Sequence, residues 1–241
     1  MAQHAKRLKI RRKDLKQPDE FETLTGQVLA WVEDHRGIVV GIASALVALV
    51  LVMVVVGRVR ASRNETAAVA FRSAHDQFEA SKYAQAAEAF SDLARDYPST
   101  PFGRLAGLYR GHALARQGDA AGAASAYADF LAATSSDGYI RQEALTSLGR
   151  AREATSDTAG ALDAYTQAAA LEGPFRTDAR LGTARMHEAS GYAAEARAIY
   201  GELLTDTTDP DLRALLATKL PADEGDEAKA AEGAPADPGA P

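Results

Sequence analysis

Residues 157–168, which read DTAGALDAYTQA, decide the fold because three other segments of the chain repeat their pattern. These segments are YAQAAEAFSDL at residues 83–93, GDAAGAASAYADF at residues 118–130 and GYAAEARAIYGEL at residues 191–203. An alanine recurs in register at steps of 37, 38 and 35 residues, and an aromatic residue follows it four positions later. The alanines are Ala86, Ala123, Ala161 and Ala196, and the aromatic residues are Phe90, Tyr127, Tyr165 and Tyr200. A sustained period of this length indicates an array of stacked structural repeats.

The repeats resemble the tetratricopeptide repeat, whose unit is a helical hairpin of about 34 residues. In that family a small residue in the first helix lets two helices approach closely, and the aromatic residue fills the gap to the next hairpin. Gly111 and Gly149 match the small position, where the other two repeats carry Ala74 and Ala184. Pro98 stands where the family ends its second helix, whereas the family's tryptophan is absent and the longer steps predict longer loops. The resemblance implies an all-α fold, a solenoid of about four helical hairpins.

The solenoid is expected to cover roughly residues 67–204. After it, Asp209-Pro210-Asp211 provides a start signal for a last helix that ends near Leu220, before Pro221. Such a helix would cap the open end of the stack. Residues 221–241 contain no apolar residue larger than alanine or proline, so we expect them to form a disordered acidic tail.

Upstream of the repeats, residues 38–56 read IVVGIASALVALVLVMVVV without a single charge. A helix of this length spans about 30 Å, the thickness of the hydrocarbon core of a bilayer. The sequence therefore predicts a single transmembrane helix over residues 37–57. No proline interrupts the chain between Arg58 and Ser81, so this helix is expected to continue into the first helix of the repeat domain, residues 58–220.

Basic residues predict the orientation of this helix. Residues 1–37 carry eight Lys and Arg, and three arginines follow the apolar run closely: Arg58, Arg60 and Arg63. The excess on the N-terminal side favours a cytoplasmic N-terminus and a C-terminal domain on the opposite side. A cleaved signal peptide fits poorly, because its apolar region would be about 7–15 residues long. The absence of cysteine excludes disulfide bonds and a lipid-attachment cysteine.

Residues 1–36 are predicted to form a cytoplasmic basic arm followed by an amphipathic helix. The arm, residues 1–16, favours contact with anionic membrane lipid over nucleic acid because it lies beside a membrane segment. The helix begins at Pro18, and its apolar residues recur at helical spacing. It is expected to lie on the membrane surface, or alternatively to dock a membrane partner. Its apolar stripe consists of Phe21, Leu24, Val28, Trp31 and Val32.

Sequence motifs of catalysis and cofactor binding are absent. There is no G-x-S-x-G, no glycine-rich phosphate loop and no H-E-x-x-H, and the five histidines are scattered. Residues 64–241 carry sixteen Lys and Arg against twenty-seven Asp and Glu, which gives no general attraction for nucleic acid. We therefore expect a non-enzymatic protein without cofactor or metal.

One set of residues is a candidate binding site. In the repeat family the first helices line the concave surface, and the position after the small residue is His75, His112, Arg150 or Arg185 in the successive repeats. Arg116 lies one turn beyond His112. This column could bind the carboxylates or backbone carbonyls of a peptide. Alternatively, the arginines pair within their own helices, with Glu153 and Glu188 three residues further on.

The complete layout, over residues 30–205, resembles the ancillary subunit of the bacterial Sec translocon. This resemblance implies an inner-membrane protein with a periplasmic repeat domain, which cooperates with translocon subunits, folding factors or secreted chains. A second resemblance rests on DYPSTPF at residues 96–102, followed by Tyr109 and Gly118-Asp119. These residues are similar to the helical repeats of envelope-assembly proteins of the outer-membrane assembly and Tol–Pal types. A third possibility is a self-associating homo-oligomeric scaffold.

Overall fold

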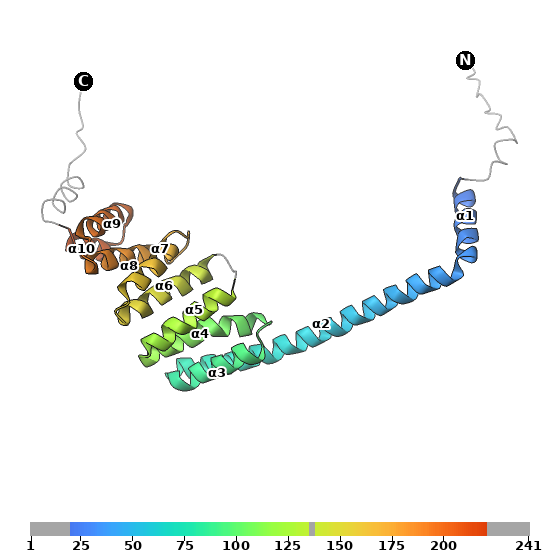
Figure 1. Ribbon diagram of the computed structural model, residues 1–241, viewed down its shortest axis with the longest axis horizontal. Helices are drawn as coiled ribbons and strands as arrows, with labels where there is room; N and C mark the ends of the chain where they lie inside the picture. Colours follow the sequence, from blue (N-terminus) through green and yellow to red (C-terminus); the bar gives the residue numbers. More distant parts are fainter. Residues whose placement is uncertain (1–19, 135–137, 221–241) are drawn as a thin grey trace, which may run out of the picture. The chain divides into compact units, whose positions relative to one another are not determined.

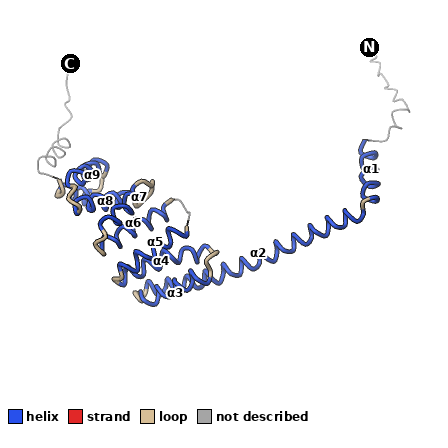
Figure 2. The backbone as a smooth tube through the Cα atoms, in the orientation of Figure 1, coloured by secondary structure: helices blue, strands red, loops and turns tan. Residues whose placement is uncertain are grey.

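The computed structural model describes residues 20–134 and 138–220, and in these ranges every regular element is a helix (Figure 2). The helices are α1 (Glu20–Asp34), α2 (Arg36–Glu79), α3 (Tyr83–Asp96), α4 (Pro101–Gln117), α5 (Ala120–Ala133), α6 (Tyr139–Ala154), α7 (Thr158–Ala169), α8 (Arg176–Ala189), α9 (Ala193–Asp206) and α10 (Pro210–Ala217). The predicted basic arm and acidic tail lie outside the described residues.

The chain divides into two compact units, residues 1–60 and 61–241, and the division falls within α2. In the second unit, each helix from α3 to α9 packs against the next one along the chain (Figure 1). The part of α2 after residue 60 packs against α3 in one apolar cluster, in which Phe71 contacts Phe90, and these two helices form the first hairpin. The following hairpins are α4–α5, α6–α7 and α8–α9. The predicted all-α fold of about four hairpins is therefore confirmed for the described residues.

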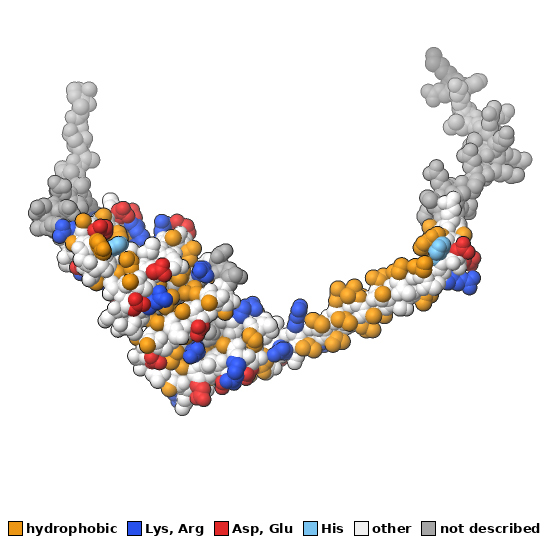
Figure 3. Space-filling model, viewed as in Figure 1, with side chains coloured by type: hydrophobic (Ala, Val, Ile, Leu, Met, Phe, Trp, Pro, Cys, Tyr) orange, Lys and Arg blue, Asp and Glu red, His pale blue; other side chains and the backbone are white. Residues whose placement is uncertain are grey.

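The first unit contains α1 and the apolar part of α2. The predicted helix near residue 18 is present as α1, and the apolar run of residues 38–56 lies in α2, which continues to Glu79 as the sequence predicted. Large apolar side chains of this run are exposed, from Val56 at 41 % to Val40 at 63 % (Figure 3). By length and composition, α2 is the one helix in the described ranges that could cross a membrane.

Glycines allow close contact between the helices of the repeat unit. A Cβ atom placed on Gly149 of α6 would lie 2.6 Å from the ring of Tyr165 on α7, and one placed on Gly182 of α8 would lie 2.6 Å from the same ring. Tyr165 is fully buried between them. Gly111 of α4 has the same relation to Tyr127 of α5, at 2.4 Å. These tyrosines thus pack against a glycine of their own hairpin, and Tyr165 also fills the gap to the next hairpin.

Aspartate caps repeat at the starts of the second helices. The side chain of Asp119 accepts a hydrogen bond from the backbone N–H of Gly122, and that of Asp157 accepts one from Gly160. These bonds satisfy backbone donors that have no partner within the helix. The predicted capping helix is present as α10, which packs against α9, and Asp209 caps its start. It ends at Ala217, three residues before the predicted end.

Candidate functional site

The five predicted site residues lie in three different surroundings. His112, Arg116 and Arg150 line one cavity of about 520 Å³. We call it the upper cavity because its residues come mostly from the earlier repeats of the chain. Arg185 lines a second one of about 490 Å³, the lower cavity. His75 lies among aromatic rings near the start of the stack. The structure therefore brings three of the five residues together.

His75 is packed into an aromatic cluster. Its ring centroid lies 6.4 Å from that of Phe71, 6.4 Å from that of Phe78 and 5.7 Å from that of Tyr109. Its Nε2 atom lies 3.8 Å from a carboxylate oxygen of Glu79, one helical turn away. His75 thus packs against other rings of the stack and already has an acidic neighbour.

His112 joins three consecutive helices. Its Nδ1 atom lies 2.8 Å from the hydroxyl of Tyr127 on α5, and its Nε2 atom lies 3.2 Å from a carboxylate oxygen of Glu143 on α6. Burial raises the pKa of Tyr127 to about 12, so the phenol keeps its proton at neutral pH. The phenol can then donate to Nδ1, and the Nε2 proton faces Glu143. His112 is therefore held by both of its ring nitrogens.

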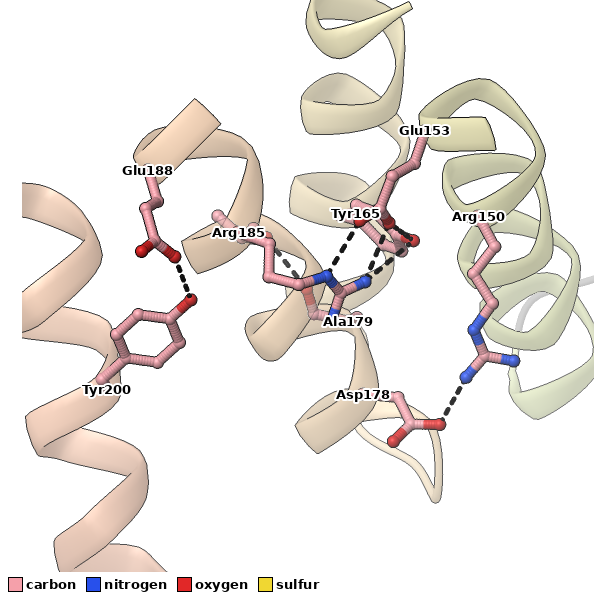
Figure 4. A network of polar contacts seen from close by, with 9 residues as sticks. Arg150, Glu153, Tyr165, Asp178, Ala179, Arg185, Glu188 and Tyr200 are labelled. Atoms are coloured by element: carbon pink, nitrogen blue, oxygen red, sulfur yellow. Dashed lines mark hydrogen bonds and ion pairs between the residues drawn. The ribbon is translucent and has the colours of Figure 1, made fainter. Parts of the chain in front are cut away.

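The two predicted arginines form ion pairs between hairpins (Figure 4). Arg150 on α6 reaches Asp178 on α8 with an N–O distance of 2.7 Å. Arg185 on α8 makes two hydrogen bonds, of 2.9 and 2.8 Å, to the carboxylate of Glu153 on α6. The alternative of pairs within one helix is wrong, because α6 and α8 lie next to each other and each supplies a partner to the other.

A tyrosine hydroxyl also contacts the glutamate of this ion pair, and the same tyrosine–glutamate contact recurs in the next hairpin. The hydroxyl of Tyr165 donates to Glu153 at 2.7 Å, and the hydroxyl of Tyr200 donates to Glu188 at 3.2 Å. In both cases the tyrosine follows the glutamate by twelve residues. Lys219, just beyond α10, reaches Glu188 at 3.1 Å, where Arg185 reaches Glu153 in the preceding repeat. Glutamate, tyrosine and cation thus recur as a unit that joins neighbouring elements of the stack.

The pKa shifts in this unit follow from its contacts. Hydrogen bonds from Arg185 lower the pKa of the Glu153 carboxyl, against the opposing effect of burial. The same hydrogen bonds raise the pKa of Arg185. Burial and the adjacent carboxylate of Glu153 raise the pKa of Tyr165. At neutral pH the unit is a carboxylate held by a guanidinium and a neutral phenol, and its charges are already matched.

Glu153→Gln is expected to lower the free energy of unfolding by about 1–2 kcal/mol at pH 7, the range for a half-exposed, charge-assisted pair. The folded-state pKa of Glu153 lies below the ordinary value of 4.5. The pair therefore stabilises the fold fully above that ordinary value, and this contribution is lost as the pH falls through the lower folded-state value.

Urea unfolding from about pH 7 down to about pH 3 measures this effect, because the deficit of the variant should shrink on acidification. The matched control is Glu88→Gln on α3, whose carboxylate is exposed and has no ion pair or hydrogen bond within the described ranges. A deficit of Glu153→Gln that stays constant with pH would show that carboxylate charge does not hold the pair.

Arg116 differs from the other predicted residues. It is exposed at the edge of the upper cavity, and it has no ion pair or hydrogen bond to any described residue. The sequence indicated Arg116 by its position but did not indicate that it alone of the five residues would lack a partner in the described ranges. The sequence pattern did not indicate several residues of the upper cavity, among them two aromatic ones, Phe78 near the end of α2 and Phe175 just before α8. Neither belongs to the repeated column, so the period carries no signal for them.

Metal-binding clusters of three or more His, Asp or Glu side chains do not occur within residues 20–134 and 138–220. A search of curated proteins gives no match. Two crystal structures of nearly identical tetratricopeptide-like repeats from Podospora anserina are similar in fold, each with a TM-score of 0.53 and 16 % identity. They cover 68 % of this chain and 88 % or 89 % of their own.

A tetratricopeptide repeat protein from Parabacteroides merdae also matches, with 16 % identity over 69 % of this chain and 77 % of its own, and a TM-score of 0.39. At these identities the likeness concerns the fold alone. The model of the tetratricopeptide repeat-like domain matches residues 30–225, which is most of the chain. Together with the helical hairpins and their glycine–aromatic contacts, this match shows that the chain belongs to the tetratricopeptide repeat-like domain family.

Proposed function

We propose that this protein is a membrane-anchored adaptor of the bacterial inner membrane, with the repeat domain in the periplasm. Repeat domains of this family typically serve as scaffolds for protein–protein interaction and not as catalysts, which supports the adaptor role. The observation that carries the membrane anchor is the run of exposed apolar side chains on α2. A hydrophobic surface of that extent is unfavourable in water and requires a lipid or protein environment.

The length of the run favours lipid over a protein partner. From Ile38 to Val56 the apolar side chains face all sides of the helix and are exposed on all of them. A helix that is apolar all round is typical of a membrane span, whereas a docking helix presents one apolar stripe. The basic residues of the N-terminal segment support its cytoplasmic location.

The partners that we propose are subunits of the Sec translocon, periplasmic folding factors or the secreted chains themselves. The support is the layout of the chain, in which one apolar helix precedes a repeat domain of four hairpins. A scaffold for envelope assembly is the second candidate, supported by residues 96–102, which extend from the end of α3 through the connecting turn to the start of α4.

Membrane fractionation and protease protection test the anchor and its orientation. In spheroplasts, an epitope at the C-terminus should be removed by added protease, and an N-terminal epitope should be protected. Arginine at both Val47 and Val50 should release the protein from the membrane, because each charge costs about 2.5–3.5 kcal/mol at the centre of a span. Leucine at the same two positions is the matched control. Protection of the C-terminal epitope would contradict the orientation.

Photocrosslinking in living cells, followed by identification of the captured protein, tests the partners. Translocon subunits or secreted chains are the expected products, with the probe at exposed positions of the repeat domain such as Ala115. Capture of outer-membrane assembly subunits would favour the second candidate instead. Capture of a second copy of this chain alone would support the self-associating scaffold and contradict the adaptor role.

A further inference from the structure

We propose that the upper cavity is where the repeat domain recognises a protein segment, and that this segment carries an aspartate or glutamate next to a large apolar side chain. The proposal rests on the proposed function, because it says which part of the repeat surface holds the partner and what chemistry that partner presents.

The volume and apolar lining of the upper cavity are suited to one large apolar side chain of a peptide and the residues next to it. Its volume of about 520 Å³ lies within the range of small-molecule and peptide pockets, roughly 300–1,000 Å³. Phe78 of the first hairpin and Phe175 at the start of the fourth both line it. Both rings are half-buried, so each keeps part of its surface for a ligand. An apolar side chain placed between them would be withdrawn from water on several sides.

The charges of the upper cavity favour a carboxylate. Glu143 is already in contact with His112, and Arg150 uses one terminal nitrogen for Asp178. A guanidinium has five N–H donors, so Arg150 retains donors that this bond does not use. Arg116 has all of its donors available, because it contacts no described polar group. The groups that remain available for a ligand are therefore mainly the N–H donors of Arg116 and Arg150, and a ligand carboxylate could accept hydrogen bonds from both arginines.

The lower cavity has no such excess of cationic donors over carboxylates. It contains Glu153 and Glu188 together with Arg185 and Lys219, and each carboxylate is paired with one of the cations. A ligand charge would have to break an existing pair to bind there. Of these two cavities the upper one is therefore better suited to bind a charged ligand, although Arg185 occupies the same repeat position as His112 and Arg150.

Fluorescence anisotropy with labelled peptides tests the proposal on the full chain in lipid nanodiscs. The probe peptide carries Asp-Phe in a Gly/Ser background, and two matched peptides carry Asn-Phe or Asp-Gly. The Asp-Phe peptide should bind, and each of the other two should bind about tenfold more weakly, the loss typical of one charge-assisted hydrogen bond or one buried side chain. Binding should also weaken at high salt. Equal binding of the Asp-Phe and Asn-Phe peptides would overturn the proposal.

Arg116→Gln should weaken binding of the Asp-Phe peptide about tenfold. The matched control is Arg197→Gln on α9, because Arg197 is also exposed and without a partner in the described ranges but lies outside both cavities. Ala115→Glu places a negative charge on an exposed residue of the upper cavity and should abolish binding. Both sites are exposed, so circular dichroism should show unchanged helicity. Binding by Arg116→Gln equal to that by Arg197→Gln would overturn the proposal.

Two further outcomes are informative. Removal of residues 221–241 should leave the affinity for the Asp-Phe peptide unchanged. A rise of tenfold or more would show that this segment occupies the cavity and would overturn the choice of a partner segment.

In cells, Arg116→Gln should reduce photocrosslinking of the partner. If Arg116→Gln still captured the partner at the wild-type level, the site would be wrong while the adaptor function would stand. If neither protein captured a partner, both proposals would fail.

Discussion

Gly149→Val is expected to lower the free energy of unfolding of the repeat domain by about 3 kcal/mol or more, the upper range for overpacking a core. Even the Cβ atom of valine would lie 2.6 Å from the ring of Tyr165, a distance at which one of the two must move. The ring cannot move easily, since it is fully buried and also lies close against Gly182 of α8. Its hydroxyl is also fixed by Glu153. The strain would therefore spread to both neighbouring hairpins.

Urea unfolding of the full chain, followed by circular dichroism, measures the cost of this substitution. Gly201→Ala in α9 is the control, because a Cβ atom there would meet nothing within 4 Å. That substitution should stabilise the protein by about 0.5–1 kcal/mol, the ordinary gain of alanine over glycine in a helix. In a Tyr165→Leu background the additional cost of Gly149→Val should largely disappear. A cost that persisted without the tyrosine ring would show that the contact is not its cause.

Gln142→Leu is expected to lower the free energy of unfolding by about 3 kcal/mol, because it leaves two part-buried backbone groups, the carbonyl of Leu171 and the N–H of Phe175, without their hydrogen-bond partner. Gln142 is fully buried on α6, and its amide nitrogen lies 3.2 Å from the carbonyl oxygen of Ala168 and 2.7 Å from that of Leu171. Its side-chain oxygen accepts a hydrogen bond of 3.1 Å from the backbone N–H of Phe175. One side chain thus holds the connection between α7 and α8. Leucine would fill a similar volume but provide no hydrogen bonds.

The same unfolding measurement, together with hydrogen exchange of residues 168–175, checks this prediction. The exchange should accelerate locally, since the freed amide lies in that connection. Gln167→Leu on α7 is the matched control, because Gln167 is exposed and bonds only to Asp163 on its own helix. Its expected effect is within about 0.5 kcal/mol. Similar losses for the two variants would mean that the buried hydrogen bonds of Gln142 contribute little to stability.

The connection held by Gln142 also positions Phe175, which lines the upper cavity. If the cavity recognises a peptide, a loosened connection should weaken that recognition as well. Stability and binding are therefore coupled through a buried amide that contacts no ligand. Nothing in the repeat pattern marked Gln142, since the other hairpins have no equivalent contact among the described hydrogen bonds.

Several features of the candidate site could be read from the sequence. The repeat register placed His112 and Arg150 at equivalent positions on successive first helices, and both line the upper cavity. The spacing of twelve residues between Glu153 and Tyr165, repeated by Glu188 and Tyr200, was also a usable signal for the tyrosine–carboxylate bonds. The spacing of residues along the sequence led to one wrong prediction, that of arginine–glutamate pairs within a helix. In the structure α6 packs against α8, and each arginine pairs with a carboxylate on the other helix.

The sequence by itself determined the helical hairpins and their number, because these depend on local periodicity and on small and aromatic residues at fixed spacing. It also determined the apolar run of α2, which composition alone defines. Only the tertiary structure decided which charges remain available. The ion pairs of Arg150 and Arg185, and the lack of any partner for Arg116 within residues 20–134 and 138–220, depend on how one hairpin is rotated against the next. That rotation is set by side chains that are distant in the sequence, such as Tyr165 between Gly149 and Gly182.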